Sequence, residues 1–243
     1  MNRFFVDKSA VKESTIEIKD REDIKHISKV LRLRVGDKIE ISDSNEFEYI
    51  AEILSIDSSI VEAKILDKQR FAREPKLKVS LFQSIPKGSK MEEIIQKTVE
   101  LGIYDIRPVF SDRTIVIENE KFNKKIERWR KIASEAVKQC KRGIVPKVHN
   151  NITFKEMLDL LDNYDLVLIP YEDEEKTTIK DVLLRDKPNT VALIIGPEGG
   201  FSESEVCNVV ERGGKAVSLG RTILRTETAG PAALAMIMYQ YEL

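Results

Sequence analysis

The sequence predicts an α/β protein with a mostly parallel sheet, preceded by a small antiparallel sheet or barrel. Up to about residue 68, apolar and polar residues alternate in short runs separated by turn residues, as in half-buried strands. After about residue 76, short apolar runs alternate with amphipathic helical segments, which is typical of a parallel sheet covered on both faces. The charged segment 67–76 contains Pro75 and has no clear period. We therefore predict two domains, 1–72 and 73–243.

In the first domain, alternation predicts strands at 38–41, 47–53 and 61–65. Turn residues separate these runs at Gly36-Asp37, 42–45 and 57–59. Three strands joined by short turns are consistent with a small antiparallel sheet or barrel.

In the second domain, strands are predicted at five places: 79–84, 105–110, 166–170, 191–196 and 216–219. Ser89 and Ser202 are each followed three residues later by Glu, the spacing of a capping box at a helix start. Gly102 and Gly213-Gly214 are expected to end these two helices. The last helix, 229–241, is apolar nearly all round, so we expect it to be buried against the sheet or a second subunit.

The composition is that of an ordinary globular protein, with 243 residues of which 42% are hydrophobic and 33% charged. No apolar stretch approaches the roughly 20 residues that span a bilayer, and the N-terminus has no signal-peptide pattern. We expect a cytoplasmic protein without membrane contact. Cys140 and Cys207 lie far apart and the sequence contains only His26 and His149, so neither a disulfide framework nor a metal site is expected.

Charge is segregated along the chain although the net charge is only -1. Residues 121–147 contain ten basic residues against two acidic ones, and 156–181 contain nine acidic residues against two basic ones. A solvated helix face would explain either run. Alternatively, the basic run lies along a polyanion, where each phosphate contact releases counterions.

The first candidate binding turn, 196–200, follows a predicted buried strand and precedes the helix that Ser202 begins. It has three glycines and one proline in five residues. Because ligands of α/β proteins bind at the carboxyl ends of the strands, a bare backbone here would let a ligand approach closely. The free amides of the next helix would face the same place. A tight strand-to-helix turn without a ligand would have the same composition.

A second turn, 219–231, again follows a strand and precedes a helix. It contains two Arg, three Thr and one Glu around Ile223 and Leu224. A helix cap would explain Thr226 or Thr228, but not Arg225 and Glu227. The first strand of this domain leads into 85–90, which matches neither a dinucleotide fingerprint nor a P-loop. That argues against nicotinamide dehydrogenases and P-loop NTPases.

Together, the segments 195–202, 219–220 and 223–229 resemble the knotted SPOUT methyltransferases. Within that group the chain is most similar to the ribosomal RNA small subunit methyltransferase E family, which methylates N3 of a uridine in 16S ribosomal RNA. Further matching positions lie along most of the chain: His26, 30–32, 36–37, 87–88, Glu92, Lys97, 100–102, Gln139, Arg142 and Pro146. The sequence departs at 138–142, where the family more often has an acidic residue before the Gln and a small pair after it.

The resemblance implies a PUA-like β-barrel that assists RNA binding, joined to an α/β domain whose C-terminal segments form a trefoil knot. It also implies a homodimer that binds S-adenosylmethionine near the subunit boundary, with Leu219, Ile223 and Leu224 as an apolar floor for adenine. The implied cofactor-binding residues are Ile169, Pro170, Tyr171, Ile195, Gly196, Pro197, Glu198, Gly199, Gly200, Leu219, Gly220, Ile223, Leu224, Arg225, Thr226, Thr228 and Ala229.

Methylation at N3 requires loss of the N3 proton, which spreads negative charge over the flanking carbonyl oxygens. A fixed guanidinium would stabilise that charge, and Arg225 is the candidate catalytic residue. Glu227 or Glu198 could accept the proton, although capping or support of the cofactor loop would equally explain either carboxylate. The candidate RNA contacts are Arg3, His26, Arg32, Arg34, Lys87, Arg113 and Arg142.

Two other functions stay open on the sequence. The same fold and cofactor would serve methylation of a ribose 2'-oxygen or of another base. A non-catalytic ribosome assembly factor would use the barrel and the basic run to bind RNA.

Overall fold

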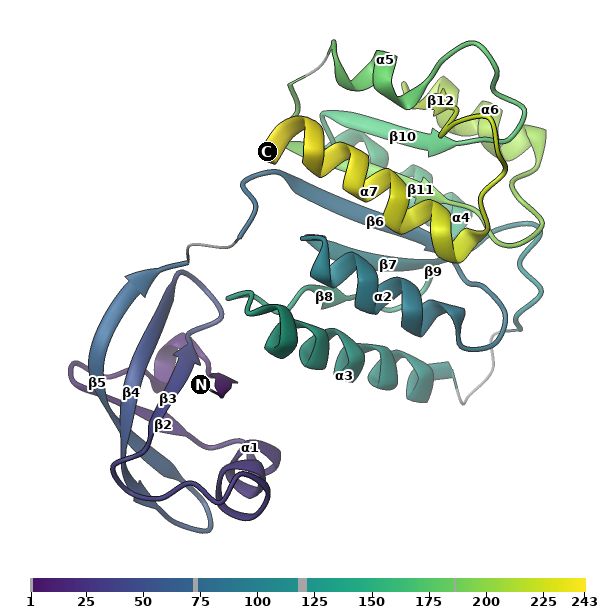
Figure 1. Ribbon diagram of the computed structural model, residues 1–243. Coiled ribbons are helices and arrows are strands. Elements are labelled where there is room, and N and C mark those ends of the chain that lie inside the picture. The colour runs from purple at the N-terminus through teal and green to yellow at the C-terminus, as the bar shows by residue number, and fades with distance from the viewer. Residues whose placement is uncertain (1, 72–73, 118–121, 186) are drawn as a thin grey trace. The chain divides into compact units, whose positions relative to one another are not determined.

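The computed structural model describes residues 2–71, 74–117, 122–185 and 187–243, which form two compact units (Figure 1). The first unit comprises Met1–Glu74 with Val137–Val145, and the second comprises Pro75–Ala136 with Pro146–Leu243. The predicted boundary at 72 and 73 lies two residues before the first of these junctions. The return of Val137–Val145 to the first unit had no signal in the local sequence pattern.

The first unit is a five-stranded sheet with the order β1-β3-β4-β5-β2. Its strands are antiparallel except for the parallel pair of β1 and β3. The three predicted strands are present and longer than predicted, whereas β1 and β2 were missed because runs of three and four residues are too short to stand out as strands. The bounds are β1 Arg3–Phe5, η1 Lys8–Ala10, β2 Thr15–Ile18, α1 Arg21–Lys25, η2 His26–Val30, β3 Lys38–Ser42, β4 Phe47–Ile56 and β5 Val61–Arg70.

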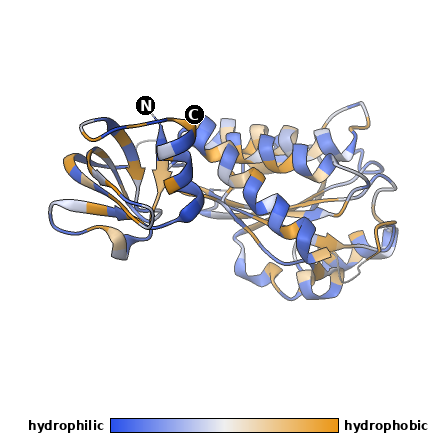
Figure 2. Ribbon diagram, turned by 90° about the horizontal axis from the view of Figure 1, so that it is seen from below, coloured by the Kyte–Doolittle hydropathy of each residue, from blue (hydrophilic) through white to orange (hydrophobic). Residues whose placement is uncertain are grey.

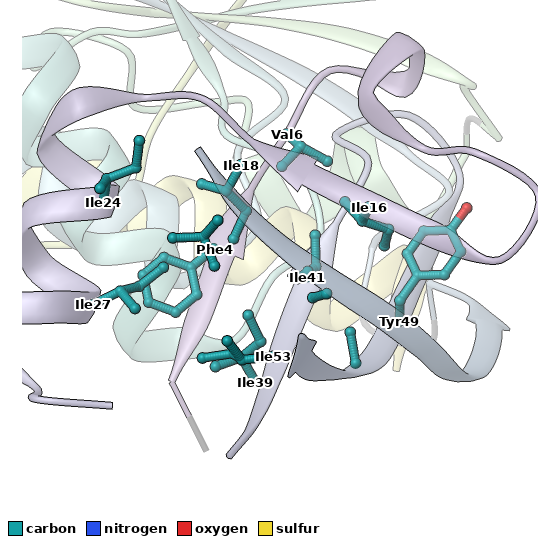
Figure 3. Packing of buried hydrophobic residues seen from close by; sticks show 13 residues of the cluster. Phe4, Val6, Ile16, Ile18, Ile24, Ile27, Ile39, Ile41, Tyr49 and Ile53 are labelled. Atoms are coloured by element: carbon teal, nitrogen blue, oxygen red, sulfur yellow. The ribbon is translucent and has the colours of Figure 1, made fainter. Parts of the chain in front are cut away.

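The core of this unit consists mainly of isoleucines from alternate positions of the strands (Figure 3). Ile16 and Ile18 of β2 and Ile39 and Ile41 of β3 are fully buried, as the period of two requires. Burial of such a side chain contributes about 1.5–3 kcal/mol. The unit therefore has a hydrophobic core of its own.

The second unit contains a parallel sheet with the order β12-β10-β11-β6-β7-β8, and β9 also pairs with β7. All five predicted strands are present, and the two-residue strands β8 and β9 are additional. The bounds are β6 Lys78–Ser84, β7 Asp105–Phe110, β8 Lys147–Val148, β9 Ile152–Thr153, β10 Leu166–Pro170, β11 Thr190–Ile195 and β12 Lys215–Val217.

Helices cover both faces of this sheet, which confirms the predicted α/β class. On one face α7 packs against β6, β11, α5 and α2 (Figure 1). On the other face, residues of α4 and α6 pack on Phe82 and Ile194. These helices carry both hydrophobic and hydrophilic residues (Figure 2). The bounds are α2 Lys90–Glu100, α3 Phe122–Cys140, α4 Phe154–Leu158, η3 Leu161–Asn163, α5 Ile179–Leu183, α6 Glu203–Glu211 and α7 Thr226–Glu242.

One of the two predicted capping boxes is confirmed and the other is wrong. The Ser202 side chain accepts from the amide of Glu205, and the Glu205 side chain accepts in return from the amide of Ser202. Ser89 makes no side-chain cap, because its backbone is not extended there, and Glu92 instead pairs with Arg128 at 2.8 Å.

The last helix, α7, begins three residues earlier than predicted and is buried on one face only. Leu234 and Ile237 are fully buried, whereas Met236 is 37% and Tyr239 73% exposed. Among the helices in the described parts of the chain, none has the length and apolar character needed to cross a membrane.

Candidate cofactor and active site

A cavity of about 540 Å³ lies at the carboxyl ends of β10, β11 and β12. This is the edge where α/β proteins bind ligands, and the volume lies within the roughly 300–1,000 Å³ of small-molecule sites. Its walls are two turns, which we name the glycine turn (196–201) and the arginine turn (218–225), together with the end of β10. The lining residues are Lys90, Pro170, Tyr171, Glu172, Ile195, Gly196, Pro197, Glu198, Gly199, Gly200, Phe201, Ser218, Leu219, Gly220, Arg221, Thr222, Ile223, Leu224, Arg225, Thr226 and Ala229.

The glycine turn closes on itself and leaves its backbone bare toward the cavity. The amide of Gly200 donates to the carbonyl of Pro197 at 3.0 Å, and Gly200 has φ +68. A Cβ atom on Gly200 would lie 2.3 Å from Oε1 of Glu172. A side chain at Gly200 would therefore be strained by its backbone conformation and would displace Glu172.

A buried chain of hydrogen bonds joins the glycine turn to the start of α7. Gln83, fully buried at the end of β6, donates from Nε2 to Oγ1 of Thr226 at 3.0 Å. Because the Thr226 hydroxyl accepts a hydrogen bond from the Gln83 side chain, its own hydrogen is free to be donated to the carbonyl of Gly196, 2.6 Å away. The chain holds the peptide group at the end of β11 in one orientation.

The arginine turn begins where β12 pairs with β10. The amide of Tyr171 donates to the carbonyl of Val217 at 3.0 Å, so the end of β10 and the start of this turn are held together. Within the turn, Leu219 and Leu224 are half-buried, whereas Ile223 is 84% exposed although it lines the cavity. An exposed isoleucine facing a cavity is available to a ligand or partner.

Arg225 is the residue immediately before α7. Its carbonyl accepts from the amides of Thr228 and Ala229, both at 2.8 Å, so its main chain is fixed by the helix. Its side chain is exposed, lines the cavity, and makes no hydrogen bond or ion pair with any described residue. Arg225 therefore lies at the cavity with a side chain that has no partner within the described residues.

Glu198 and Glu227 both pair with Lys90. The Lys90 ammonium lies 2.9 Å from Oε1 of Glu198 and 3.5 Å from Oε2 of Glu227. Burial alone would raise the pKa of Glu198, but hydrogen bonds from Lys90 and from the backbone outweigh it and hold this pKa below the ordinary value. The hydrogen bond to Glu198 likewise raises the pKa of Lys90. Glu198 is therefore an ionised carboxylate with weakened proton affinity.

The segment after β7 supports the glycine turn from outside. Arg113 donates from Nη1 to the carbonyl of Gly199 at 2.7 Å. The amide of Asp112 donates to Oε1 of Glu205 at 2.9 Å, and Ser202 donates to Oδ2 of Asp112. Arg113, predicted as an RNA contact, thus binds the predicted cofactor turn.

All of the predicted cofactor-binding residues line the cavity except Ile169 and Thr228. Ile169 is fully buried in the core beneath it, and Thr228 is an exposed residue in the first turn of α7. Glu227, predicted as a catalytic candidate, is not a lining residue. The sequence prediction missed Lys90, Glu172, Phe201, Ser218, Arg221 and Thr222. Arg221 and Thr222 belong to the turn 219–231 that the sequence already indicated, but no local sequence pattern indicated Lys90 or Glu172.

Two predicted RNA contacts are structural residues instead. The Arg3 side chain is 4% exposed, pairs with Glu48 at 2.5 Å and Glu40 at 3.2 Å, and donates to two carbonyls of 141–142. Arg142, 6% exposed, pairs with Glu74 at 2.8 Å. Because both guanidinium groups are buried against carboxylates, we withdraw both from the candidate RNA contacts.

The remaining candidates are accessible. Arg32, Arg34, Lys87 and Arg113 are exposed, and His26 is half-buried with its ring 6.2 Å from that of Phe4. In the basic run, Lys121 lies outside the described residues. Within the described residues, no group of three or more His, Cys, Asp or Glu side chains is arranged to hold a metal ion.

Comparison with known families supports the division into two functional parts. Residues 73–238 match an RNA methyltransferase domain, and residues 18–66 match an RNA methyltransferase PUA domain. An RNA methyltransferase with an N-terminal PUA domain is the class of protein that these matches define.

Individual relatives make the assignment more specific. The ribosomal RNA small subunit methyltransferase E of Bacillus subtilis is 35% identical over 251 residues, covering 100% of this chain and 98% of the relative. The crystal structure of the enzyme of that name from Neisseria gonorrhoeae, bound to S-adenosylmethionine, is 32% identical with a TM-score of 0.87, covering 99% of this chain and 98% of the other. A Legionella pneumophila protein solved with bound S-adenosylmethionine is 32% identical with a TM-score of 0.85, covering 98% and 96%. The chain belongs to the ribosomal RNA small subunit methyltransferase E family.

Proposed function

We propose that this protein transfers a methyl group from S-adenosylmethionine to N3 of a uridine in 16S ribosomal RNA. The observation that carries the proposal is the cavity between the glycine turn and the arginine turn, in a chain of this family. Relatives solved with S-adenosylmethionine support the choice of cofactor.

The residues around the cavity fit this cofactor. S-adenosylmethionine supplies a methyl group on a sulfonium when it is bound. Bare backbone at the glycine turn lets a large ligand approach, and Leu219 and Leu224 provide apolar surface for a nucleoside base.

Most of the catalysis is positioning, with electrostatic stabilisation by one side chain. The glycine turn and the arginine turn bind the methyl donor, and the exposed part of the arginine turn contacts the uridine. The Arg225 guanidinium stabilises the negative charge that develops on the uracil carbonyl oxygens as the N3 proton leaves. Both candidate bases pair with Lys90; the lowered pKa of Glu198 makes it a poor proton acceptor, and Glu227 does not line the cavity. We therefore assign Glu198 and Glu227 to support of the site.

Candidate RNA contacts come from each of the two units. Arg32, Arg34 and His26 of the PUA unit are candidates for phosphate or base contacts. Lys87 lies between β6 and α2, close to the glycine turn through its amide, which donates to Glu198 at 3.1 Å. Because the substrate is ribosomal RNA, the protein is expected to work in the cytoplasm.

We further propose that the protein is a homodimer with a trefoil knot at its C-terminal end, as its resemblance to the SPOUT group implies. The half-exposed apolar face of α7, with Met236 and Tyr239, supports the dimer. The packing of α7 on the inner strands β6 and β11, after the chain has formed the outer strand β12, supports a crossed chain path.

Nucleoside analysis of methylated RNA tests the proposed function. Purified protein is incubated with labelled S-adenosylmethionine and either naked 16S RNA or small ribosomal subunits that lack the modification. We expect label in N3-methyluridine. Label in a 2'-O-methylated nucleoside or another base would contradict the assigned position, and RNA binding without any cofactor binding would favour an assembly factor.

A further inference from the structure

Lys90 connects three segments that lie far apart in the sequence. It is the first residue of α2, and its ammonium pairs with Glu198 on the glycine turn and with Glu227 in the first turn of α7, at 2.9 and 3.5 Å. The amide of Lys87, just before α2, also donates to Oε1 of Glu198. Glu198 is therefore bound by the loop that leads into α2 and by the first residue of that helix.

The pair with Glu227 compensates a carboxylate oxygen that has no hydrogen-bond partner among the described residues. Oε2 of Glu227 is inaccessible to solvent and accepts no hydrogen bond from the described residues, and the Glu227 side chain as a whole is 16% exposed. An uncompensated carboxylate in such a place is unfavourable. Without the Lys90 charge, Glu227 would have to take up a proton or turn toward water, and turning toward water would disturb the first turn of α7.

That first turn also carries the candidate catalytic residue. Arg225 is two residues before Glu227, and its carbonyl is bound by the amides of the same turn. Thr226, between them, donates to Gly196 of the glycine turn. A displacement of Glu227 would therefore change the place of Arg225 relative to the glycine turn.

We propose that Lys90 is a positioning residue for methyl transfer, which acts through Glu198 on the glycine turn and through Glu227 on the turn that carries Arg225. The inference rests on the proposed function, because it assigns these turns to cofactor binding and catalysis. Lys90 needs no contact with cofactor or RNA in this role.

The first test compares substitutions at Lys90 with a matched control on the same helix. Lys90→Met should weaken S-adenosylmethionine binding by about tenfold in calorimetry and lower kcat by at least as much, because both turns lose their common partner. Lys90→Arg should retain most of both, since a guanidinium reaches the same carboxylates. Lys97→Met, which removes an exposed ion pair with Glu93, should change neither.

Melting temperatures separate positioning from a general structural role. Lys90→Met leaves Oε2 of Glu227 without a compensating charge, so some fall in the melting temperature is expected, and affinity and kcat are therefore compared well below that temperature. A large fall in the melting temperature, with unchanged affinity and kcat in the protein that remains folded, would overturn the inference.

The second test asks whether Lys90 acts through the two carboxylates. In a Glu198→Gln, Glu227→Gln background, Lys90→Met should cause little further loss, because the pairs are already gone. An equal loss in both backgrounds would mean that Lys90 binds a ligand itself, which overturns the inference. If Lys90→Met does not fold, Glu198→Gln alone should lower the affinity by a similar factor, and unchanged affinity would overturn it.

These outcomes are distinguishable from failure of the proposed function. If the unchanged protein binds no S-adenosylmethionine, the function itself is wrong. If it binds and methylates normally while the variants behave additively, only the role of Lys90 is wrong.

Discussion

At the residue scale, the account depends on side chains held by partners distant in sequence. The glycines of 196–200 and the residues around Arg225 could be selected from the sequence, because bare turns after apolar strands leave a local signal. Gln83 and Lys90 could not, because each looks ordinary until the fold brings Thr226, Glu198 and Glu227 to it. The burial of Arg3 and Arg142 could not be predicted either, because arginine side chains are usually found at the surface.

Removal of the Arg225 guanidinium should affect turnover rather than cofactor binding. Arg225→Ala is expected to lower kcat by about 10²-fold or more, because it removes the charge that stabilises the developing oxyanion. The dissociation constant of S-adenosylmethionine, measured by calorimetry, should change by less than about threefold. Equal losses in both would make Arg225 a binding residue.

Loss of the Thr226 hydroxyl should affect cofactor binding. Thr226→Val removes the donor to the carbonyl of Gly196 and one of the two acceptors of Gln83 Nε2, which also donates to the carbonyl of Ser84, at a cost of about 1–3 kcal/mol. We expect about tenfold weaker binding of S-adenosylmethionine, whereas Thr226→Ser keeps the hydroxyl and serves as the control. Unchanged binding by Thr226→Val would show that the glycine turn holds its shape without this chain.

Asp105 in the second unit should make stability depend on pH in the acid range. Burial raises the pKa of Asp105, but hydrogen bonds from His149 and Ser80 and the charge of Arg107 outweigh it, so the pKa lies below its ordinary value. A lowered pKa in the folded state contributes stability above the unfolded pKa of about 3.9 and loses it as pH falls further. Asp105→Asn should therefore cost about 1–3 kcal/mol at pH 5 in urea unfolding, and less at pH 3. If the difference in the free energy of unfolding between the unchanged protein and Asp105→Asn grew as the pH fell, the pKa of Asp105 would not be lowered by folding.

At the scale of elements, strands and helices with a clear period were predictable and short ones were not. The five main strands of the parallel sheet matched because each is a compact apolar run. The two-residue strands β8 and β9 are too short to show any period. The failed capping box at Ser89 shows that the spacing alone does not fix the backbone conformation on which the cap depends.

Helix α3 carries most of the basic run, and part of that charge is already paired with carboxylates of the chain. Arg128 pairs with Glu92, and Arg130 pairs with Glu127 at 2.5 Å. Lys124 and Lys125 are exposed. These exposed lysines are compatible with a solvated helix face and with an RNA-binding face.

Charge reversal on α3 distinguishes them. Lys124→Glu, Lys125→Glu, Arg128→Glu and Lys131→Glu together should weaken binding to 16S RNA and flatten its salt dependence, because fewer counterions are released. Lys176→Glu with Lys180→Glu, in the acidic segment, is the control. Filter binding over a range of salt concentrations measures the slope, and an unchanged slope would support the solvated face.

At the scale of the whole molecule, the local sequence pattern leaves the order of the strands and the long-range contacts undetermined. Periodicity indicates which residues are strands, but not that the sheet order is β12-β10-β11-β6-β7-β8. The same holds for the return of Val137–Val145 to the first unit, which depends on long-range contacts. A knotted path is rare enough that only resemblance could propose it.

The proposed dimer predicts a consequence for α7. Tyr239→Glu with Met236→Glu should convert the dimer to a monomer in light scattering, because charges replace apolar side chains on the exposed face. Val210→Glu, at an exposed valine of α6 that is 47% accessible, is the control. A wild-type protein that is monomeric at micromolar concentration would refute the dimer.

A crystal structure of the protein with S-adenosylmethionine tests the central claim most directly. The account predicts the nucleoside in the cavity, between the glycine turn and the arginine turn, with the methyl group on the side that Arg225 faces. Density for the cofactor elsewhere, or these two turns closed on each other with no ligand between them at saturating concentration, would contradict it.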